Sequence, residues 1–211
     1  MTDETVSHSF PPAKGGRRNS IASQSAGGRA LAAVSLVGFM GAGKTTVGRA
    51  LAARLGWRFE DLDDLIQARD GRTIEQIFQQ QGESAFRDLE HRLVREILTT
   101  AKSAPLVLAL GGGAFLLEPV QRALRDSGIP AVFLDASVEE LFRRSEQPEV
   151  VRPLRRDREH FGQLYERRRP AYLKAELRVE TEGKAVAAVV EEIISGLNLV
   201  PRSGPRSGVR E

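Results

Sequence analysis

Short apolar runs alternate with longer helical patterns along most of this 211-residue chain. Five of the runs are rich in apolar or β-branched residues and are short, as expected of strands that are buried on both faces of a sheet. These strand candidates are Ala33–Val37, Trp57–Glu60, Leu106–Leu110, Ala131–Leu134 and Leu177–Val179.

Helical patterns fill the intervals between the strand candidates. In Glu83–Thr100 the apolar residues fall on one helical face, which is typical of a helix that packs on a core. Because strands and helices alternate, the sequence predicts an α/β domain with a parallel sheet and helices on both sides. A ligand should then lie beyond the carboxyl ends of the strands. The helix candidates are Lys44–Leu55, Leu62–Arg69, Ile74–Gln80, Glu83–Thr100, Pro119–Ser127, Val138–Arg144, Glu159–Ala175 and Ala185–Ser195.

The two ends of the chain lack this pattern. Residues 1–30 are rich in Ser, Gly, Ala and Pro, and residues 201–211 repeat Pro-Arg-Ser-Gly, so we expect a disordered leader and a disordered tail. A basic recognition or phosphorylation patch at Arg17–Ser20 is an alternative for part of the leader. The folded domain is therefore predicted to span residues 31–200.

Composition and charge narrow the classes of protein that fit. The chain has no cysteine, which excludes disulfides and thiolate metal sites. It has no apolar run of the roughly 18 residues that span a bilayer, and its start lacks the apolar core of a signal peptide. We therefore expect a cytoplasmic protein without membrane contact. Residues 1–30 and 197–211 each carry a net charge of +2 and the whole chain +3, so the part between them is not basic and no nucleic-acid partner is expected.

The strongest local signal is the glycine-rich run between the first strand candidate and the first helix candidate. Residues Gly38 to Thr45 complete the phosphate-loop pattern G-x-x-x-x-G-K-[ST] in the strand–turn–helix context that this motif requires. The glycines let backbone N–H groups surround a phosphate, and the helix adds its positive dipole end. Lys44 can reach the outer phosphates, and the Thr45 hydroxyl is a candidate magnesium ligand. The sequence therefore predicts a nucleoside triphosphate site.

Two carboxylates follow the second strand candidate. Asp61 and Asp63 are two residues apart, so both can reach a crevice near the phosphate loop. One of them could hold magnesium through its hydration shell, and the other could accept a proton or hydrogen bond from a substrate hydroxyl. Capping of the next helix by Asp61 or Asp63 is an equally good explanation at this point, whereas Asp64 fits first-turn helix charge.

Three glycines, Gly111–Gly113, directly follow the third strand candidate. Glycines at this place allow a bound group to approach the backbone closely, although a simple flexible turn is the alternative.

Arginines supply the cations that such a site needs. Arg87 lies in the first turn of a helix, where the dipole disfavours a cation, so an anionic neighbour such as Glu90 is expected. Arg152 lies between polar segments, and Arg167–Arg169 place three cations on one helical turn. Arginines of this kind can grip a carboxylate and a transferring phosphoryl group.

As an ordered set, these motifs resemble the shikimate kinase family over about residues 33–196. The resemblance implies a three-layer P-loop fold like that of nucleoside monophosphate kinases, with a five-stranded parallel sheet flanked by helices. It implies ATP-dependent phosphorylation of the 3-hydroxyl of shikimate, in the pathway to chorismate and aromatic amino acids, with Mg²⁺ as cofactor. The motifs are Gly41–Lys44, Asp61–Asp63, Phe86–Glu90, Gly111–Gly113, Arg152–Leu154 and Arg168–Tyr172.

The same resemblance implies roles for single residues. Thr45 would bind magnesium directly and Asp61 through water, while Asp63 would hold the reacting hydroxyl and is the candidate base. Arg87 and Arg168 would grip the carboxylate of shikimate beside the backbone of Gly111, Gly112 and Gly113. The implied ATP-binding residues are Gly41, Ala42, Gly43, Lys44, Thr45, Thr46, Arg144 beside the adenine, and Arg152 on a lid at about residues 145–158.

Lys44 and Arg152 join Asp63 as the candidate catalytic residues, because phosphoryl transfer needs neutralised charge more than covalent help. The segment Glu180–Lys184 departs from the family by lacking the Asn and Pro that are frequent in its adenine-side loop.

Two other functions fit the phosphate loop alone. A gluconate or nucleotide kinase would share the architecture but lack the combined Asp-x-Asp, Gly-Gly-Gly and carboxylate-gripping arginines. A ligand-sensing module would need a DNA-binding helix-turn-helix, which residues 1–30 are too polar to form. We therefore expect an enzyme with small-molecule substrates that acts as a monomer.

Overall fold

The computed structural model describes residues 31–101, 104–146 and 158–201. The expected leader (1–30), residues 147–157 of the lid expected at about 145–158, with Arg152, and residues 202–211 of the expected tail (201–211) lie outside these residues.

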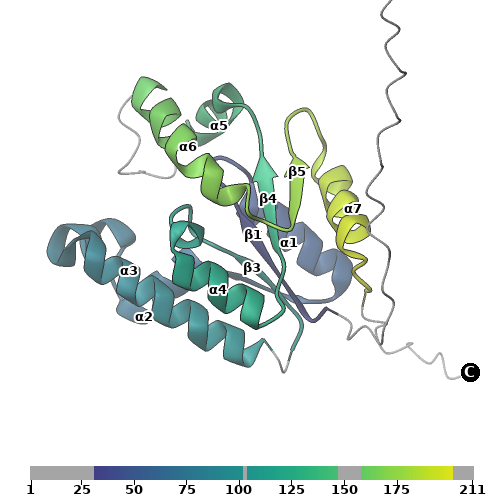
Figure 1. Cartoon of the computed structure of the whole chain (residues 1–211), viewed down its shortest axis with the longest axis horizontal. Coiled ribbons are helices and arrows are strands. Elements are labelled where there is room, and N and C mark those ends of the chain that lie inside the picture. Colours follow the sequence, from purple (N-terminus) through teal and green to yellow (C-terminus); the bar gives the residue numbers. More distant parts are fainter. Residues whose placement is uncertain (1–30, 102–103, 147–157, 202–211) are drawn as a thin grey trace, which may run out of the picture.

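A five-stranded, fully parallel sheet forms the centre of the molecule, as predicted (Figure 1). Its order is β2-β3-β1-β4-β5, so the strand that precedes the phosphate loop lies in the middle. Every residue of β1, β3 and β4 is buried, which explains why these strands read as continuous apolar runs. The strands are β1 (Ala33–Val37), β2 (Arg58–Asp61), β3 (Leu106–Ala109), β4 (Ala131–Asp135) and β5 (Leu177–Glu180).

Helices cover both faces of the sheet. Helix α1 packs beside α7 on one face, and α3 packs beside α4 on the other (Figure 1). A short 3₁₀ turn, η1 (Ala114–Leu116), follows β3 and was not predicted. Among the described residues, no helix is both long and apolar enough to cross a membrane. The helices are α1 (Lys44–Leu55), α2 (Leu62–Asp70), α3 (Ile74–Thr100), α4 (Glu118–Asp126), α5 (Val138–Ser145), α6 (Arg158–Tyr172) and α7 (Val186–Leu197).

Helix α3 joins two helices that the sequence predicts separately. Thr73 and Gln76 form a capping box at its start, and the helix is interrupted at Gly82, whose φ of 78° and ψ of 175° are not helical. The two predicted helices are thus confirmed, and they meet at a kink at Gly82.

The order of the strands creates a crevice beside the phosphate loop. From β1 the chain crosses toward β2, whereas from the adjacent β3 it crosses in the opposite direction toward β4. The loops that follow β1 and β3 thus diverge at the carboxyl edge of the sheet, where α/β proteins bind their ligands.

Candidate active site

The phosphate loop connects β1 to α1 and depends on its glycines. Gly38, Gly41 and Gly43 have φ angles of 144°, 81° and 88°, which other residues rarely adopt. A Cβ on Gly38 would lie 2.6 Å from the carbonyl oxygen of Leu134, and one on Gly41 would overlap that of Leu141. The loop is therefore packed tightly against the segment from β4 to α5.

Helix α1 leaves its first turn open for an anion. Its N-cap, Gly43, has no side chain that could accept from the first-turn N–H groups, and no acidic residue lies in that turn. The Lys44 ammonium reaches back over the loop and donates to the carbonyl oxygens of Gly38 at 3.0 Å and Phe39 at 3.1 Å.

Thr45 and Asp61 meet beside this helix end. The Thr45 hydroxyl donates to Oδ2 of Asp61 at 2.7 Å, while Oδ1 of Asp61 accepts from the backbone N–H of Asp63 at 3.1 Å and caps α2. From the sequence, capping of the next helix and a place near a phosphate-bound metal were alternative roles for Asp61. Asp61 combines the cap with a position against Thr45, because it uses a different oxygen for each.

Asp63 reaches the end of β3. A Cβ on Gly111 would lie 2.5 Å from Oδ1 of Asp63 and 3.2 Å from Oε1 of Glu90, so a larger residue there would displace the Asp63 carboxylate. The guanidinium of Arg87 fills the corresponding space at Gly113. At Gly112, by contrast, a Cβ would make only ordinary contacts.

Arg87 is held in place by two glutamates of its own helix. Its guanidinium pairs with Glu90 at 2.8 Å and with Glu83 at 3.1 Å, and its side chain is only 17% exposed. The anionic neighbour expected from the sequence is thus confirmed.

Glu90 is the site residue to which the sequence reasoning gave no role beyond pairing with Arg87. Its side chain is 1% exposed. Burial raises the pKa of its carboxyl to about 7, although Arg87 and Arg168 lower that pKa and Asp63 raises it further. The carboxylates of Glu90 and Asp63 and the guanidinium groups of Arg87 and Arg168 therefore lie close enough to influence one another's charge.

Arg168 and Tyr172 reach the glycine segment from helix α6. The Arg168 guanidinium donates to the carbonyl oxygen of Gly112 at 3.3 Å, and the Tyr172 hydroxyl donates to the same oxygen. Burial raises the pKa of Tyr172 to about 12, so its hydroxyl remains a donor at neutral pH. The guanidinium of Arg168 also lies 5.7 Å from the ring centroid of Phe39 in the phosphate loop.

Arg144, near the end of α5, connects this helix to the segment after β5. It pairs with Glu140 at 2.7 Å and donates to the hydroxyl and carbonyl oxygens of Thr181, which follows β5. This is the segment where the sequence analysis expects the adenine. Arg152 lies outside the described residues.

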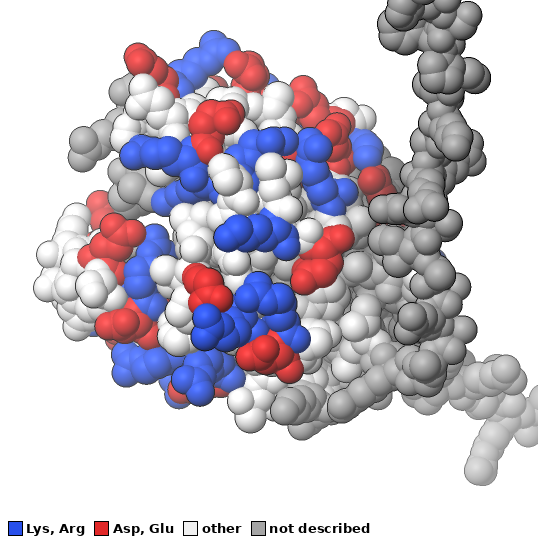
Figure 2. All heavy atoms as spheres, in the orientation of Figure 1, with Lys and Arg blue, Asp and Glu red and all other residues white. Residues whose placement is uncertain are grey.

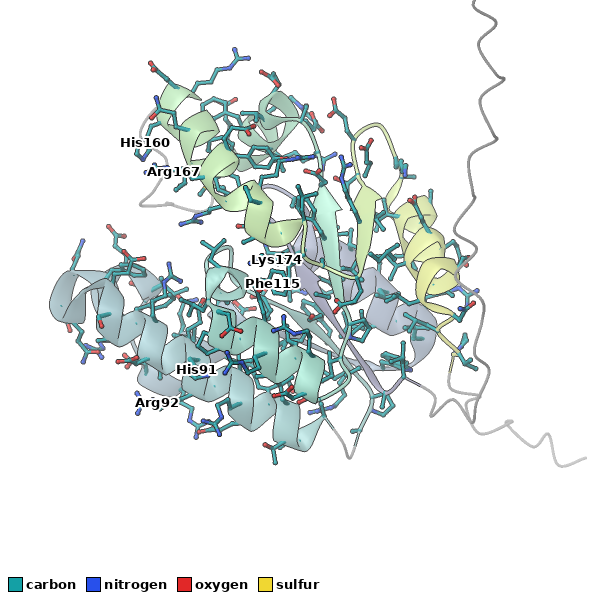
Figure 3. The ribbon with its side chains drawn as sticks, viewed as in Figure 1. His91, Arg92, Phe115, His160, Arg167 and Lys174 are labelled. Atoms are coloured by element: carbon teal, nitrogen blue, oxygen red, sulfur yellow. The ribbon has the colours of Figure 1, made fainter. Side chains whose placement is uncertain are left out.

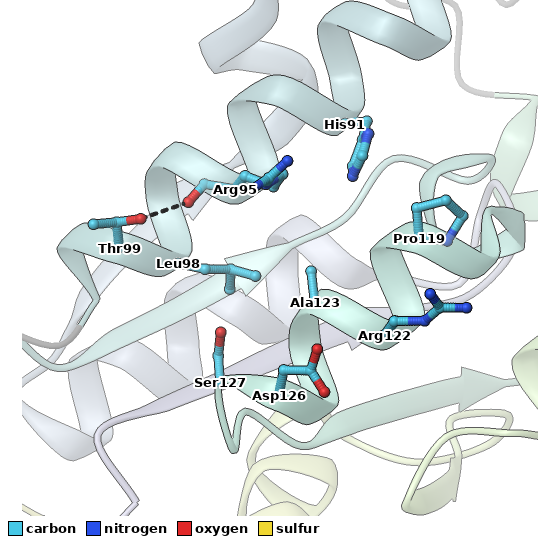
Figure 4. Close-up of a pocket in the computed structure, with 9 residues that line it drawn as sticks. All are labelled: His91, Arg95, Leu98, Thr99, Pro119, Arg122, Ala123, Asp126 and Ser127. Carbon is cyan, nitrogen blue, oxygen red and sulfur yellow. Dashed lines mark hydrogen bonds between the residues drawn. The ribbon is translucent and has the colours of Figure 1, made fainter.

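The site is distinct from a groove between α3 and α4 of about 360 Å³ (Figure 4). None of the candidate site residues lines that groove, which is bordered by His91, Arg95, Leu98, Thr99, Pro119, Arg122, Ala123, Asp126 and Ser127. The candidate residues instead gather at the carboxyl edge of the sheet. There the phosphate loop adjoins the glycine segment, which is bordered by two arginines that suit a carboxylate and one aspartate that suits a hydroxyl.

Comparisons with known proteins agree with this geometry. A family model described as shikimate kinase matches residues 40–198. A shikimate kinase of Persephonella marina is 38% identical over 161 residues, covering 76% of this chain and 96% of the relative. One of Thermus thermophilus is 43% identical over 167 residues, covering 78% and 89%. Among solved structures, shikimate kinase from Acinetobacter baumannii in complex with shikimate superposes with a TM-score of 0.72 at 34% identity, covering 78% of this chain and 92% of that one.

Proposed function

The chain belongs to the shikimate kinase family, and from this membership we infer that it transfers the γ-phosphoryl group of ATP to the 3-hydroxyl of shikimate. The products are shikimate 3-phosphate and ADP, on the pathway to chorismate and the aromatic amino acids. One observation carries the inference for this chain. Asp63, Arg87 and Arg168 converge on Gly111–Gly113, and a Cβ on Gly112 would lie 3.8 Å from the phosphate-loop carbonyl of Gly38.

On the acceptor side, Arg87 and Arg168 bind the carboxylate of shikimate. Both guanidinium groups border the glycine segment, Arg87 at Gly113 and Arg168 at Gly112. An anion between them would form charge-assisted bonds with two planar donors, which is the geometry that arginine offers and lysine does not. A side chain at Gly111 or Gly113 would displace Asp63 or Arg87, so glycine at these positions preserves the placement of both groups.

On the donor side, residues Gly41 to Thr46 surround the phosphates of ATP. Lys44 exchanges its carbonyl partners in the loop for the outer phosphates. Arg152 adds a second cation from the lid at about residues 145–158, and Arg144 flanks the adenine. These roles balance the charge that spreads over the γ-phosphoryl oxygens during transfer.

Magnesium fits the oxygen donors that Thr45 and Asp61 bring together. The ion prefers hard oxygen ligands and is usually bound by one or two protein groups together with substrate phosphates. When bound, it supplies charge neutralisation at the β- and γ-phosphates. The 2.7 Å contact between Thr45 and Asp61 supports their assignment to that site.

Asp63 accepts the proton of the 3-hydroxyl during the reaction. The hydroxyl oxygen forms a bond to the γ-phosphorus while the bond from that phosphorus to the bridging oxygen of ADP breaks. The proton moves to the Asp63 carboxylate, and the displaced oxygen leaves with ADP. The place of Asp63 beside Gly111, between the two halves of the site, supports this role.

An ADP-release assay tests the function directly. We expect ATP consumption that requires both magnesium and shikimate and is much slower with quinate or gluconate. The Asp63→Asn variant should lose about 10²- to 10⁴-fold in kcat, because general-base catalysis contributes on that order. Its affinity for nucleotide should stay measurable by calorimetry.

Asp64→Asn is the matched control for this variant. Asp64 is the next residue in the chain, is exposed and lies in the first turn of α2, so near-normal turnover is expected. Absence of turnover with shikimate by the native protein would contradict the function. Near-normal rates of Asp63→Asn would contradict the assignment of the base. A cytoplasmic location and a monomeric state stay predictions.

A further inference from the structure

A buried carboxylate that takes no part in the proposed reaction lies at the end of β4. The Asp135 side chain is 3% exposed and accepts from four donors, with both of its oxygens in use. Oδ1 accepts from the Tyr165 hydroxyl at 2.6 Å and from the backbone N–H of Ala136 at 3.0 Å. Oδ2 accepts from Arg178 at 2.9 Å and from Arg169 at 3.3 Å.

Two of these donors belong to helix α6. Tyr165 and Arg169 are four residues apart and therefore lie on the same side of the helix. They also contact each other, because Nε of Arg169 donates to the Tyr165 hydroxyl at 3.1 Å. Asp135 thus fixes one side of α6 against the sheet at the level of Arg168, the arginine that we assign to the substrate carboxylate.

The backbone of α6 is weak at this level. Pro170 lies inside the helix, two residues after Arg168. A proline has no N–H, so the carbonyl of Glu166 loses its helical hydrogen bond and the turn that carries Arg168 is less well held by the backbone. The direction in which Arg168 points therefore depends on side-chain hydrogen bonds on both sides of Pro170. These are made by Tyr165 and Arg169 before it and by Tyr172 after it.

The phosphate loop packs against the same part of α6. The ring of Phe39 is buried and meets Tyr165 edge-on, with their centroids 5.5 Å apart. It meets Phe161 in the same way at 4.9 Å. Arg168, on the same helix, also lies near the Phe39 ring, with its guanidinium 5.7 Å from the ring centroid. The rotation of α6 about its axis therefore determines the position of Arg168.

We propose that Asp135 and Tyr165 are positioning residues for Arg168. By binding α6 through Tyr165 and Arg169, Asp135 holds the helix in the rotation that directs Arg168 toward Gly112. The proposal rests on the proposed function, because it presumes that Arg168 binds the carboxylate of the acceptor. Burial and the bond to Asp135 raise the pKa of Tyr165 to about 12, so its hydroxyl keeps donating over the whole working pH range.

The variant Tyr165→Phe tests this role with little change in packing. It removes the hydroxyl but keeps the ring that packs on Phe39. We expect the KM for shikimate to rise about 5- to 20-fold while kcat and the KM for ATP stay within about twofold, because a misplaced Arg168 weakens binding of the ground state and the transition state alike. The midpoint of thermal unfolding is recorded in parallel.

Two control variants separate positioning from general stability. Arg178 comes from β5 and binds Oδ2 of Asp135, as Arg169 does, without belonging to α6. Arg178→Ala should therefore leave the KM for shikimate unchanged even if it lowers the melting temperature. Arg167 is exposed on α6, and among the described residues it donates to the backbone carbonyl of Gln163 in the same helix. Arg167→Ala should therefore behave like the native protein (Figure 3).

A double-mutant comparison asks whether Tyr165 acts through Arg168. In an Arg168→Lys background, Tyr165→Phe should change the KM for shikimate by less than about twofold, because the group that it positions is already replaced. Asp135→Asn should raise the KM in the same direction as Tyr165→Phe, since it removes the charge that attracts Arg169.

Three outcomes would overturn the proposal. They are an unchanged KM for shikimate in Tyr165→Phe, an equal rise in Arg178→Ala, and a rise that persists in full in the Arg168→Lys background. Failure of the proposed function looks different, because the native protein would then have no turnover with shikimate at all.

Discussion

Glu90 gives the site a property that depends on pH. Its carboxyl is buried with a pKa of about 7, above the usual 4.5. The groups that face it are Arg87 on its own helix, Asp63 from α2 and Arg168 from α6. Because the folded state holds the proton more firmly than the unfolded state does, Glu90 favours folding at low pH. That contribution is lost as the pH rises from about 4.5 through about 7.

Replacing Glu90 by glutamine should remove this dependence. The free energy of unfolding of Glu90→Gln, relative to the native protein, should increase by about 2–3 kcal/mol between pH 5 and pH 8. Urea unfolding at pH 5, 6, 7 and 8 measures the difference. Glu83→Gln is the matched control, since Glu83 pairs with the same arginine but is 68% exposed, and it should give a nearly constant difference. A constant difference for Glu90→Gln would show that Glu90 titrates normally.

Individual residues could be predicted where a motif fixes their place. Thr45, Asp61, Asp63, Arg87 and Arg168 lie at loop ends or in spaced motifs, and the structure brings them to one edge of the sheet. Burial is harder to predict, because it depends on which elements meet.

A signal for Glu90 was nevertheless present in the sequence. It lies four residues after Phe86 and three before Leu93, within the apolar face of its helix. A charge in that face indicates a buried group. For Asp135 no comparable pattern exists, because its partners come from α6 and β5, 30 to 43 residues away along the chain.

At the scale of elements, hydrophobic periodicity located every strand and nearly every helix. Each strand candidate agrees with an observed strand to within one residue at either end. The 3₁₀ turn η1 has three residues, which is too short to show a period. The separation of two helices within α3 came from glycine and polar residues near position 82, where the structure has a kink.

The kink offers a test at this scale. Gly82 has a φ of 78° and a ψ of 175°, a region that only glycine enters readily, and no atom lies within 4 Å of the place where a Cβ would be. Gly82→Ala should therefore destabilise the fold by about 1–3 kcal/mol through backbone strain alone. Chemical denaturation measures the change.

Gly71 provides the comparison for Gly82. It has the same φ of 78° but a ψ of 1°, and its surroundings are equally open. Gly71→Ala adopts a left-handed conformation that costs about 1 kcal/mol, so Gly82→Ala should be the more damaging of the two. Equal effects would mean that α3 straightens when Gly82 is replaced.

At the scale of the whole molecule, charge is dispersed over the visible surface. Figure 2 shows basic and acidic side chains interspersed over the face formed by α3, α4 and α6. Within α4, Arg122 forms an exposed ion pair with Glu118 at 2.7 Å. Exposed pairs of this kind contribute little to stability. The fold rests instead on the apolar core around the sheet.

The positions of the elements and of the candidate site residues along the chain predict how a truncated protein behaves. Strand β1 begins at Ala33, and the candidate residues lie between Gly41 and Arg168. A chain of residues 30–201 should therefore keep its kcat and both KM values within about twofold of the full chain, because it retains every strand and helix that the structure describes and all the candidate site residues. Steady-state kinetics of both forms checks this. A large loss of activity would assign a role to the leader or the tail.

The contacts of Lys44 have a consequence for the way in which nucleotide enters. Its ammonium donates to the carbonyl oxygens of Gly38 and Phe39, so the loop itself offers acceptors to the cation that the motif directs at phosphate. A phosphate that binds Lys44 therefore competes with these two carbonyls for its hydrogen bonds. The two carbonyls belong to the backbone, and no side-chain substitution can remove them. The competition between loop and nucleotide for this lysine is therefore built into the backbone of the motif.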